Sequence, residues 1–180
     1  MPRIKLATIW LSGCSGCHMS LLDLDERLFE LVQKADIVYS PLMDVKEYPQ
    51  NVDVVLVEGA IANEEQLDFI QVVRSRSRIV VSFGDCAVTG NITALRNNLK
   101  SLNSVLAYNY FEAADIQKQI PDTQEFVPRL LERVVPVHVM IPVDVFLPGC
   151  PPHADHIWAA LAPLLNHETP HLKNEQIKFG

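Results

Sequence analysis

Short apolar runs alternate along the chain with stretches whose apolar residues recur every three or four positions. Short apolar runs are typical of buried strands, and the longer period is typical of helices. The pattern predicts five strands, at residues 4–11, 36–40, 52–57, 78–83 and 143–147. Strands that alternate with helices predict an α/β fold built on a parallel sheet.

Three amphipathic helices are expected between and after these strands. The first follows Cys17, the second begins at Asn63, and the third follows the last strand. Their apolar stripes consist of Leu21, Leu24, Leu28, Leu31 and Val32, of Leu67, Ile70 and Val73, and of Ile157, Trp158, Leu161 and Leu164. Pro163 lies inside the third stripe, so we expect it to kink or shorten that helix.

Residues 98–142 lack such a regular pattern. They mix Asn, Pro, Tyr and Phe, with one helix-like piece near residues 124–133. Long irregular insertions in compact domains are often functional. We therefore expect this stretch to cover the site or to contact a partner.

Composition places the chain among ordinary globular proteins. With 180 residues, 48% of them hydrophobic, residues 1–180 are expected to form a single domain. No apolar run reaches the roughly 18 residues of a membrane span, and no secretory signal is evident, so the simplest location is the cytoplasm. A net charge of −7 disfavours nucleic-acid binding. The basic cluster of Arg74, Arg76 and Arg78 is interpreted as cations at a helix C-terminus.

The four cysteines all follow predicted strands. Cys14 and Cys17 follow the first strand, Cys86 the fourth, and Cys150 the fifth. Because the carboxyl ends of parallel strands meet at one edge of a sheet, the four thiols are expected to face that edge together. The glycines beside them would let backbone amides approach an anionic sulfur cluster and tune its potential. These are Gly13, Gly16, Gly84 and Gly149.

Residue types alone favour an iron–sulfur cluster over three alternatives. A disulfide framework is typical of secreted proteins, and no secretion signal is evident here. A structural zinc site usually takes two C-x-x-C pairs, and this chain has one. A dithiol oxidoreductase would explain the pair of Cys14 and Cys17, which lies between a strand and a helix, but it would leave Cys86 and Cys150 without a role.

Four glycine-bearing motifs stand in order between residues 13 and 152. They are Gly13-Cys14-Ser15-Gly16-Cys17, Val57-Glu58-Gly59-Ala60-Ile61, Gly84-Asp85-Cys86-Ala87 and Pro148-Gly149-Cys150-Pro151-Pro152. This ordered set resembles the small subunits of [NiFe] hydrogenases and the related cluster subunit of respiratory complex I. The resemblance implies a flavodoxin-like three-layer sandwich with a mainly parallel sheet. It also implies one proximal [4Fe–4S] cluster on the four cysteines, supported by the motif glycines and Glu58, next to the Ni–Fe centre of a large subunit.

Two features point to one branch of this family. The first motif has C-x-x-C, as hydrogenases do, whereas the complex I subunit has adjacent cysteines there. The chain ends at Gly180 with only four cysteines, so one cluster uses every thiol. It thus resembles the short small subunit of bidirectional NAD(P)-linked hydrogenases. That likeness implies diaphorase partners with flavin, Fe–S clusters and NAD(P), and no hydrogenase activity from this chain alone. A quinone-linked complex I subunit is the alternative.

The motifs also depart from the family. Many hydrogenases have a glutamate two residues after the second cysteine, where this chain has Met19 after His18. His18 is interpreted either as a proton relay or as a cap of the following helix. Glu58 either supports the cluster or is a strand-end acid bonded to backbone amides. His153 and His156 are interpreted as helix-start or interface residues. FMN at the same edge is a further alternative, disfavoured by the lack of a Ser/Thr-rich phosphate loop after the first strand.

Overall fold

The centre of the molecule is a five-stranded parallel sheet. The structure is a computed structural model that describes residues 3–99, 101–116, 118–120 and 127–179. The strands are β1 (Ile4–Trp10), β2 (Ala35–Tyr39), β3 (Val52–Glu58), β5 (Ser77–Phe83) and β7 (Val145–Leu147). They lie in the order β2-β1-β3-β5-β7, and every neighbouring pair is parallel. This is the strand order of flavodoxin-like folds, so the predicted fold class is confirmed.

All five predicted strands are present, with bounds shifted by one or two residues. The central strand β3 is buried along almost its whole length, as expected for a parallel strand covered on both faces. Glu58 at its end pairs with Trp10 of β1 and with Phe83 of β5. These three strands therefore end at the same level, and the loops that follow them start from a common edge.

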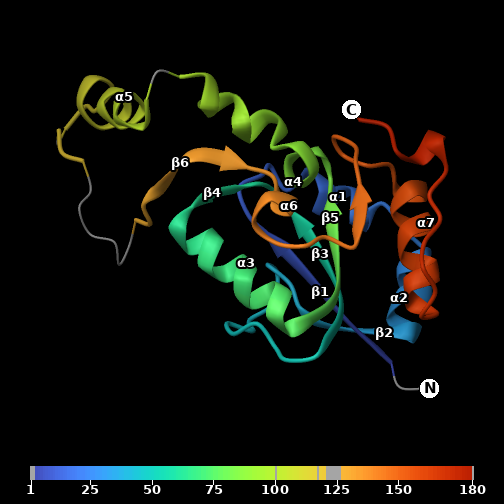
Figure 1. Cartoon of the computed structure of the whole chain (residues 1–180). Helices are drawn as coiled ribbons and strands as arrows, with labels where there is room; N and C mark the ends of the chain where they lie inside the picture. Colours follow the sequence, from blue (N-terminus) through green and yellow to red (C-terminus); the bar gives the residue numbers. More distant parts are fainter. Residues whose placement is uncertain (1–2, 100, 117, 121–126, 180) are drawn as a thin grey trace.

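Helices cover both faces of the sheet (Figure 1). One face is covered by α1 (Gly16–Leu22), α2 (Arg27–Lys34) and α7 (Ala154–Leu165). The other is covered by α3 (Glu64–Arg76), α4 (Asp85–Thr89) and α6 (Val137–Met140). Leu6 and Phe83 pack toward the first group, and Ile9 and Val57 toward the second. The result is the three-layer arrangement that the resemblance implied.

Two helix predictions need correction. The helix expected after Cys17 is split into α1 and α2, because Asp25 between them has φ of 52°. The helix-like piece near residues 124–133 is wrong in its described part: residues 130–133 belong to β6 (Leu130–Val135), and residues 124–126 lie outside the described ranges. β6 pairs antiparallel with β4 (Ile61–Asn63), so tertiary pairing overrides its local preference.

The first described part of the irregular stretch, together with the helix that precedes it, forms an arm beside the sheet. It includes the 3₁₀ helix η1 (Asn91–Asn98), α5 (Leu102–Ala107) and the π-helical turn η2 (Tyr108–Glu112). In Figure 1 α5 lies far from α7, beyond β6. A further 3₁₀ turn, η3 (Asn174–Gln176), lies near the C-terminus. Across the described ranges, no helix is both long and apolar enough to cross a bilayer.

Smaller predictions hold. Asn63 caps α3 by accepting a hydrogen bond from the Gln66 backbone at 2.8 Å. Arg74 and Arg76 lie in the last turn of α3, as expected for cations at a helix C-terminus, whereas Arg78 lies in β5. Pro163 lies inside α7, which ends two residues later.

Candidate metal centre

The four cysteines meet at the carboxyl edge of the sheet. Cys14 lies in the loop after β1, Cys17 in the first turn of α1, Cys86 in α4, and Cys150 in the loop after β7. All four are free thiols; Cys17 and Cys86 are buried, and the other two are exposed. Burial first, and then the charges of Glu58 and the other three cysteines, raise the pKa of the Cys17 thiol far above its usual value. Three loops thus bring the four sulfurs into electrostatic contact.

The donor set fits a group that takes four thiolates. The pKa of Cys86 is also raised, by burial and then by the charges of Cys14 and Cys150. Four thiolates at one edge would repel one another unless a cationic group bound them. An iron–sulfur cluster supplies that group, since it is held by cysteine thiolates. Within the described ranges, no group of three or more His, Cys, Asp or Glu is arranged to hold a single metal ion.

Glycine is required at the position where the loops approach most closely. A Cβ atom on Gly84 would lie 2.1 Å from Sγ of Cys17, and the residue has φ of 84°. A side chain there would displace a candidate ligand and strain the backbone. The other motif glycines lie in the same loops: Gly13 and Gly16 flank Cys14, Gly59 follows β3, and Gly149 precedes Cys150.

Asp85 joins two cysteine loops, a role that the sequence reasoning did not assign. Its Oδ1 accepts a hydrogen bond from the Gly149 backbone at 2.6 Å, and its own backbone N–H donates to the Gly149 carbonyl at 2.9 Å. The side chain is 4% exposed. The residue before Cys86 therefore holds the residue before Cys150. The position of Asp85 inside the Gly84-Asp85-Cys86-Ala87 motif was the sequence feature that could have indicated this role.

Glu58 organises the start of α1. The carboxylate is 1% exposed and accepts hydrogen bonds from the backbone N–H groups of Cys17 at 3.4 Å and His18 at 2.9 Å. It also pairs with Nδ1 of His18. Glu58 is thus a strand-end acid bonded to backbone amides, and it lies next to a candidate ligand. The interpretation as a strand-end acid is confirmed, and support of the cluster stays a prediction.

The expectation that His18 caps the following helix is wrong. His18 lies inside α1, whose N-cap is Ser15, and its ring turns inward to Glu58 and the edge of Phe83. Because Glu58 stands at the end of a neighbouring strand, the pairing is tertiary and leaves no local signature. Met19 is exposed on the same helix. His153 is the N-cap of α7, as its helix-start interpretation predicted, and His156 lies in the first turn.

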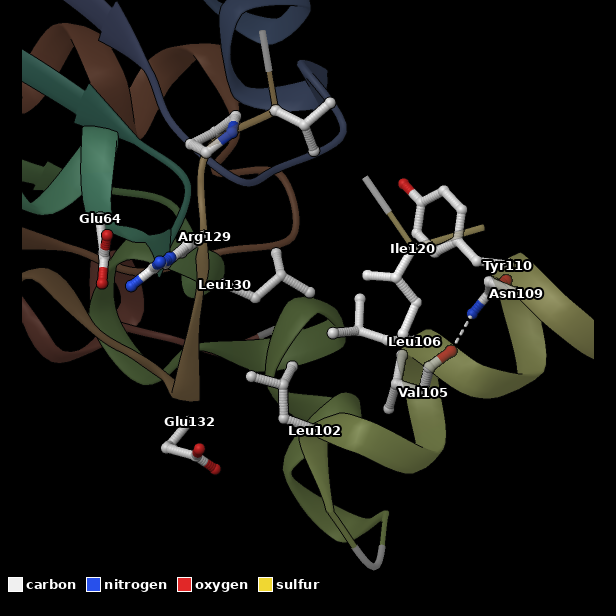
Figure 2. Close-up of a pocket in the computed structure, with 12 residues that line it drawn as sticks. Glu64, Leu102, Val105, Leu106, Asn109, Tyr110, Ile120, Arg129, Leu130 and Glu132 are labelled. Atoms are coloured by element: carbon white, nitrogen blue, oxygen red, sulfur yellow. Dashed lines mark hydrogen bonds between the residues drawn. The ribbon is translucent and has the colours of Figure 1, made fainter. Parts of the chain in front are cut away.

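A hollow of about 740 Å³ lies elsewhere, between α5 and β6. Figure 2 shows Leu102, Val105 and Leu106 of α5 facing Leu130 of β6 across it. None of the residues that line this hollow is a cysteine. The cysteine edge and this cavity are therefore separate features.

Comparison with known proteins gives consistent relatives. The chain is 43% identical over 171 residues to the vhu G subunit of the F420-non-reducing hydrogenase of Methanocaldococcus jannaschii, matching 94% of this chain and 58% of that protein. It is 38% identical over 167 residues to the delta subunit of the NAD-reducing hydrogenase HoxS of Cupriavidus necator, matching 91% and 79%. The chain thus spans little more than half of the first relative.

A solved structure shares the whole fold. One chain of the crystal structure of an NAD⁺-reducing [NiFe]-hydrogenase in the H₂-reduced state superposes with a TM-score of 0.93 at 35% identity. The match covers 99% of this chain and all of that chain. Both the sheet and the insertion therefore have counterparts in that protein.

Fold and site together define a flavodoxin-like domain whose loops gather four cysteines at the carboxyl edge of a parallel sheet. Residues 14–164 match the family model described as "NADH ubiquinone oxidoreductase, 20 Kd subunit". The chain belongs to this family, and its relatives within it are hydrogenase small subunits, as the motifs indicated.

Proposed function

We propose that the chain is a hydrogenase small subunit that relays single electrons through one [4Fe–4S] cluster held by Cys14, Cys17, Cys86 and Cys150. The cluster would exchange electrons with the Ni–Fe centre of a large partner subunit and with an NAD(P)-linked diaphorase module that carries flavin and further clusters. The observation that carries the proposal is the convergence of four free thiols from three loops at one sheet edge. The relatives, which are hydrogenase subunits, support the assignment to a hydrogenase.

The residues around the thiols would hold and orient the cluster. Bound there, it would supply reversible one-electron chemistry. Gly84 leaves the space that Cys17 occupies, Asp85 keeps the Cys86 and Cys150 loops together, and Glu58 fixes the first turn of α1. Cys14 and Cys150 are exposed, so the cluster would lie near the surface that meets a partner. Two further predictions stay part of this proposal. Residues 1–180 form a single domain, and the protein works in the cytoplasm.

Metal and sulfide analysis of the anaerobically purified complex tests the proposal. About four irons per chain are expected, with acid-labile sulfide and an EPR signal on reduction. One zinc per chain would instead support an interaction module, no metal would support a dithiol oxidoreductase, and released FMN would support a flavin site. After cluster reconstitution the chain alone is expected to show no H₂-dependent dye reduction, and such activity would contradict the need for a large subunit.

A quinone-linked complex I subunit is the second candidate, favoured by the description of the family. H₂-dependent reduction of NAD(P) by the complex, without quinone, distinguishes the two. Reduction of quinone from NADH with no response to H₂ would favour the second.

A further inference from the structure

The turn that follows α4 brings polar hydrogens to two of the four sulfurs. Nδ2 of Asn91 donates a hydrogen bond to Sγ of Cys150 at 3.3 Å, across 59 positions of sequence. An amide that donates to a thiolate makes a charge-assisted hydrogen bond, which is stronger than a neutral one. Asn91 lies outside the four glycine-bearing motifs, so the sequence pattern assigned it no role.

The same turn serves the neighbouring sulfur through its backbone. Hydrogen bonds from the backbone of Thr93 and Ile92 act on the Cys86 thiol and favour its thiolate form. Burial and the charges of Cys14 and Cys150 outweigh them, so the pKa of Cys86 stays raised. The backbone of this turn thus acts on Cys86 in the same sense as the Asn91 side chain acts on Cys150, and the Asn91 bond carries the geometry.

The conformation of the turn is determined by the fold. Gly90 and Asn91 have φ of 88° and 33°, and a Cβ atom on Gly90 would lie 2.9 Å from Cβ of Ala94. Asparagine is among the few side chains that tolerate such angles. The Gly90 N–H donates to the Cys86 carbonyl at 2.9 Å, so the turn starts directly from the helix that carries a candidate ligand.

The far end of η1 is also anchored. Arg96 donates to the Leu131 carbonyl at 2.9 Å, and Asn97 exchanges two hydrogen bonds with the backbone of Val134. Both partners belong to β6, so the donors of the turn are held between α4 and the β4–β6 ribbon. Such preorganised donors need no rearrangement when a cluster changes its charge.

We propose that Asn91, held by the turn at residues 90–93 and donating to Sγ of Cys150, is a positioning residue that raises the reduction potential of the cluster. The inference rests on the proposed function, because it requires a cluster on these cysteines. Reduction adds negative charge to the cluster, and donors to its sulfurs stabilise the more negative state. Loss of the Asn91 donor should therefore favour the oxidised state.

The test is the reduction potential of the cluster in the assembled complex, measured by an EPR-monitored redox titration. Asn91→Asp keeps a residue that tolerates positive φ, removes the N–H donor and adds a negative charge. It is expected to shift the equilibrium toward the oxidised cluster about tenfold, which for one electron is about 59 mV. Asn91→Gly removes the donor without adding charge and should shift it less, in the same direction.

Asn98→Asp is the matched control. It makes the same charge change on the exposed end of η1, about 14 Å along the helix at 2.0 Å per residue. A potential that stays at the wild-type value in the Asn91 variants, with four irons retained, would overturn the inference. So would an equal shift in Asn98→Asp. If the Asn91→Asp complex loses iron, the reduction potential of the cluster in the Asn91→Gly complex tests the inference instead. Absence of four irons from the wild-type complex would instead refute the proposed function.

Discussion

At the scale of single residues, two buried carboxylates hold the cysteine loops together by hydrogen bonds. Asp85 accepts the Gly149 N–H from the loop after β7, and Glu58 accepts backbone N–H groups from the start of α1. Buried carboxylates are retained where such donors compensate for lost hydration. Each acid therefore couples one strand end to a loop that comes from another strand. Their removal should loosen the site without removing a thiol.

Asp85→Ala is expected to lower both stability and iron content. The change leaves the Gly149 N–H without its buried acceptor, which costs about 1–3 kcal/mol. Urea denaturation and iron analysis of the purified chain measure the two effects. Asp68→Ala, on the exposed side of α3, is the control and should leave both unchanged. Full iron content and wild-type stability in Asp85→Ala would contradict the proposed coupling of the two loops.

Cys86→Ser is expected to lose or convert the cluster. A hydroxyl is a harder and poorer ligand for iron–sulfur centres than a thiolate, while its size preserves the packing of α4. EPR of the reduced complex and iron analysis measure the result. A normal [4Fe–4S] signal in this variant would remove Cys86 from the proposed ligand set.

At the scale of elements, the loop between β2 and β3 is fastened to the face of the sheet that α3 covers. The loop between β2 and β3 folds back so that Tyr48 contacts Tyr39 of β2 and Phe69 of α3. Its hydroxyl forms a 2.6 Å hydrogen bond with Ser77 at the start of β5. Burial raises the pKa of Tyr48 to about 12. This one side chain therefore joins β2, α3 and β5 on one face of the sheet.

The raised pKa predicts an alkaline loss of stability. Tyr48 keeps its proton in the folded state up to pH about 12, whereas an unfolded tyrosine loses it near pH 10. Its contribution is fully present below pH 10 and is lost as pH rises from 10 to 12, by roughly 2–3 kcal/mol. Urea denaturation from pH 8 to 11.5 measures it. Tyr48→Phe should start lower and decline less steeply, and parallel pH profiles would contradict the assignment.

At the scale of the whole molecule, the arm formed by α5 and η2 does not pack over the five-stranded sheet, whereas α6, later in the same irregular stretch, does. Tyr108 and Phe111 are 58% and 42% exposed, and Tyr110 lines the hollow between α5 and β6 (Figure 2). The sequence left two interpretations of these three aromatic residues, contact with a partner or packing over the chain's own sheet, and the second is wrong. Large exposed aromatic side chains are enriched at interfaces, so the arm stays a predicted contact with a partner.

Assembly with the large subunit is expected to protect the cysteine edge. The loops around Cys17, Glu58, Cys86 and His153 lie beyond the strand ends, where the proposed cluster would meet its electron donor. Hydrogen exchange of the free chain and of the complex measures the difference, with the arm at residues 108–111 as a second reporter. Unchanged exchange at these loops, with protection only along α3, would place the partner on another face.

The sequence by itself determined the five strands, the parallel α/β class and the place of each cysteine after a strand. Apolar runs and chain order carry that information locally, because buried parallel strands must be apolar and their carboxyl ends share one edge. Only the tertiary structure decided which residues contact one another around the cysteines. Asp85 meets Gly149 across 64 positions, Asn91 meets Cys150 across 59, and His18 meets Glu58 across 40. Such contacts, like the pairing of β6 with β4, depend on how distant elements pack, and no local periodicity records them.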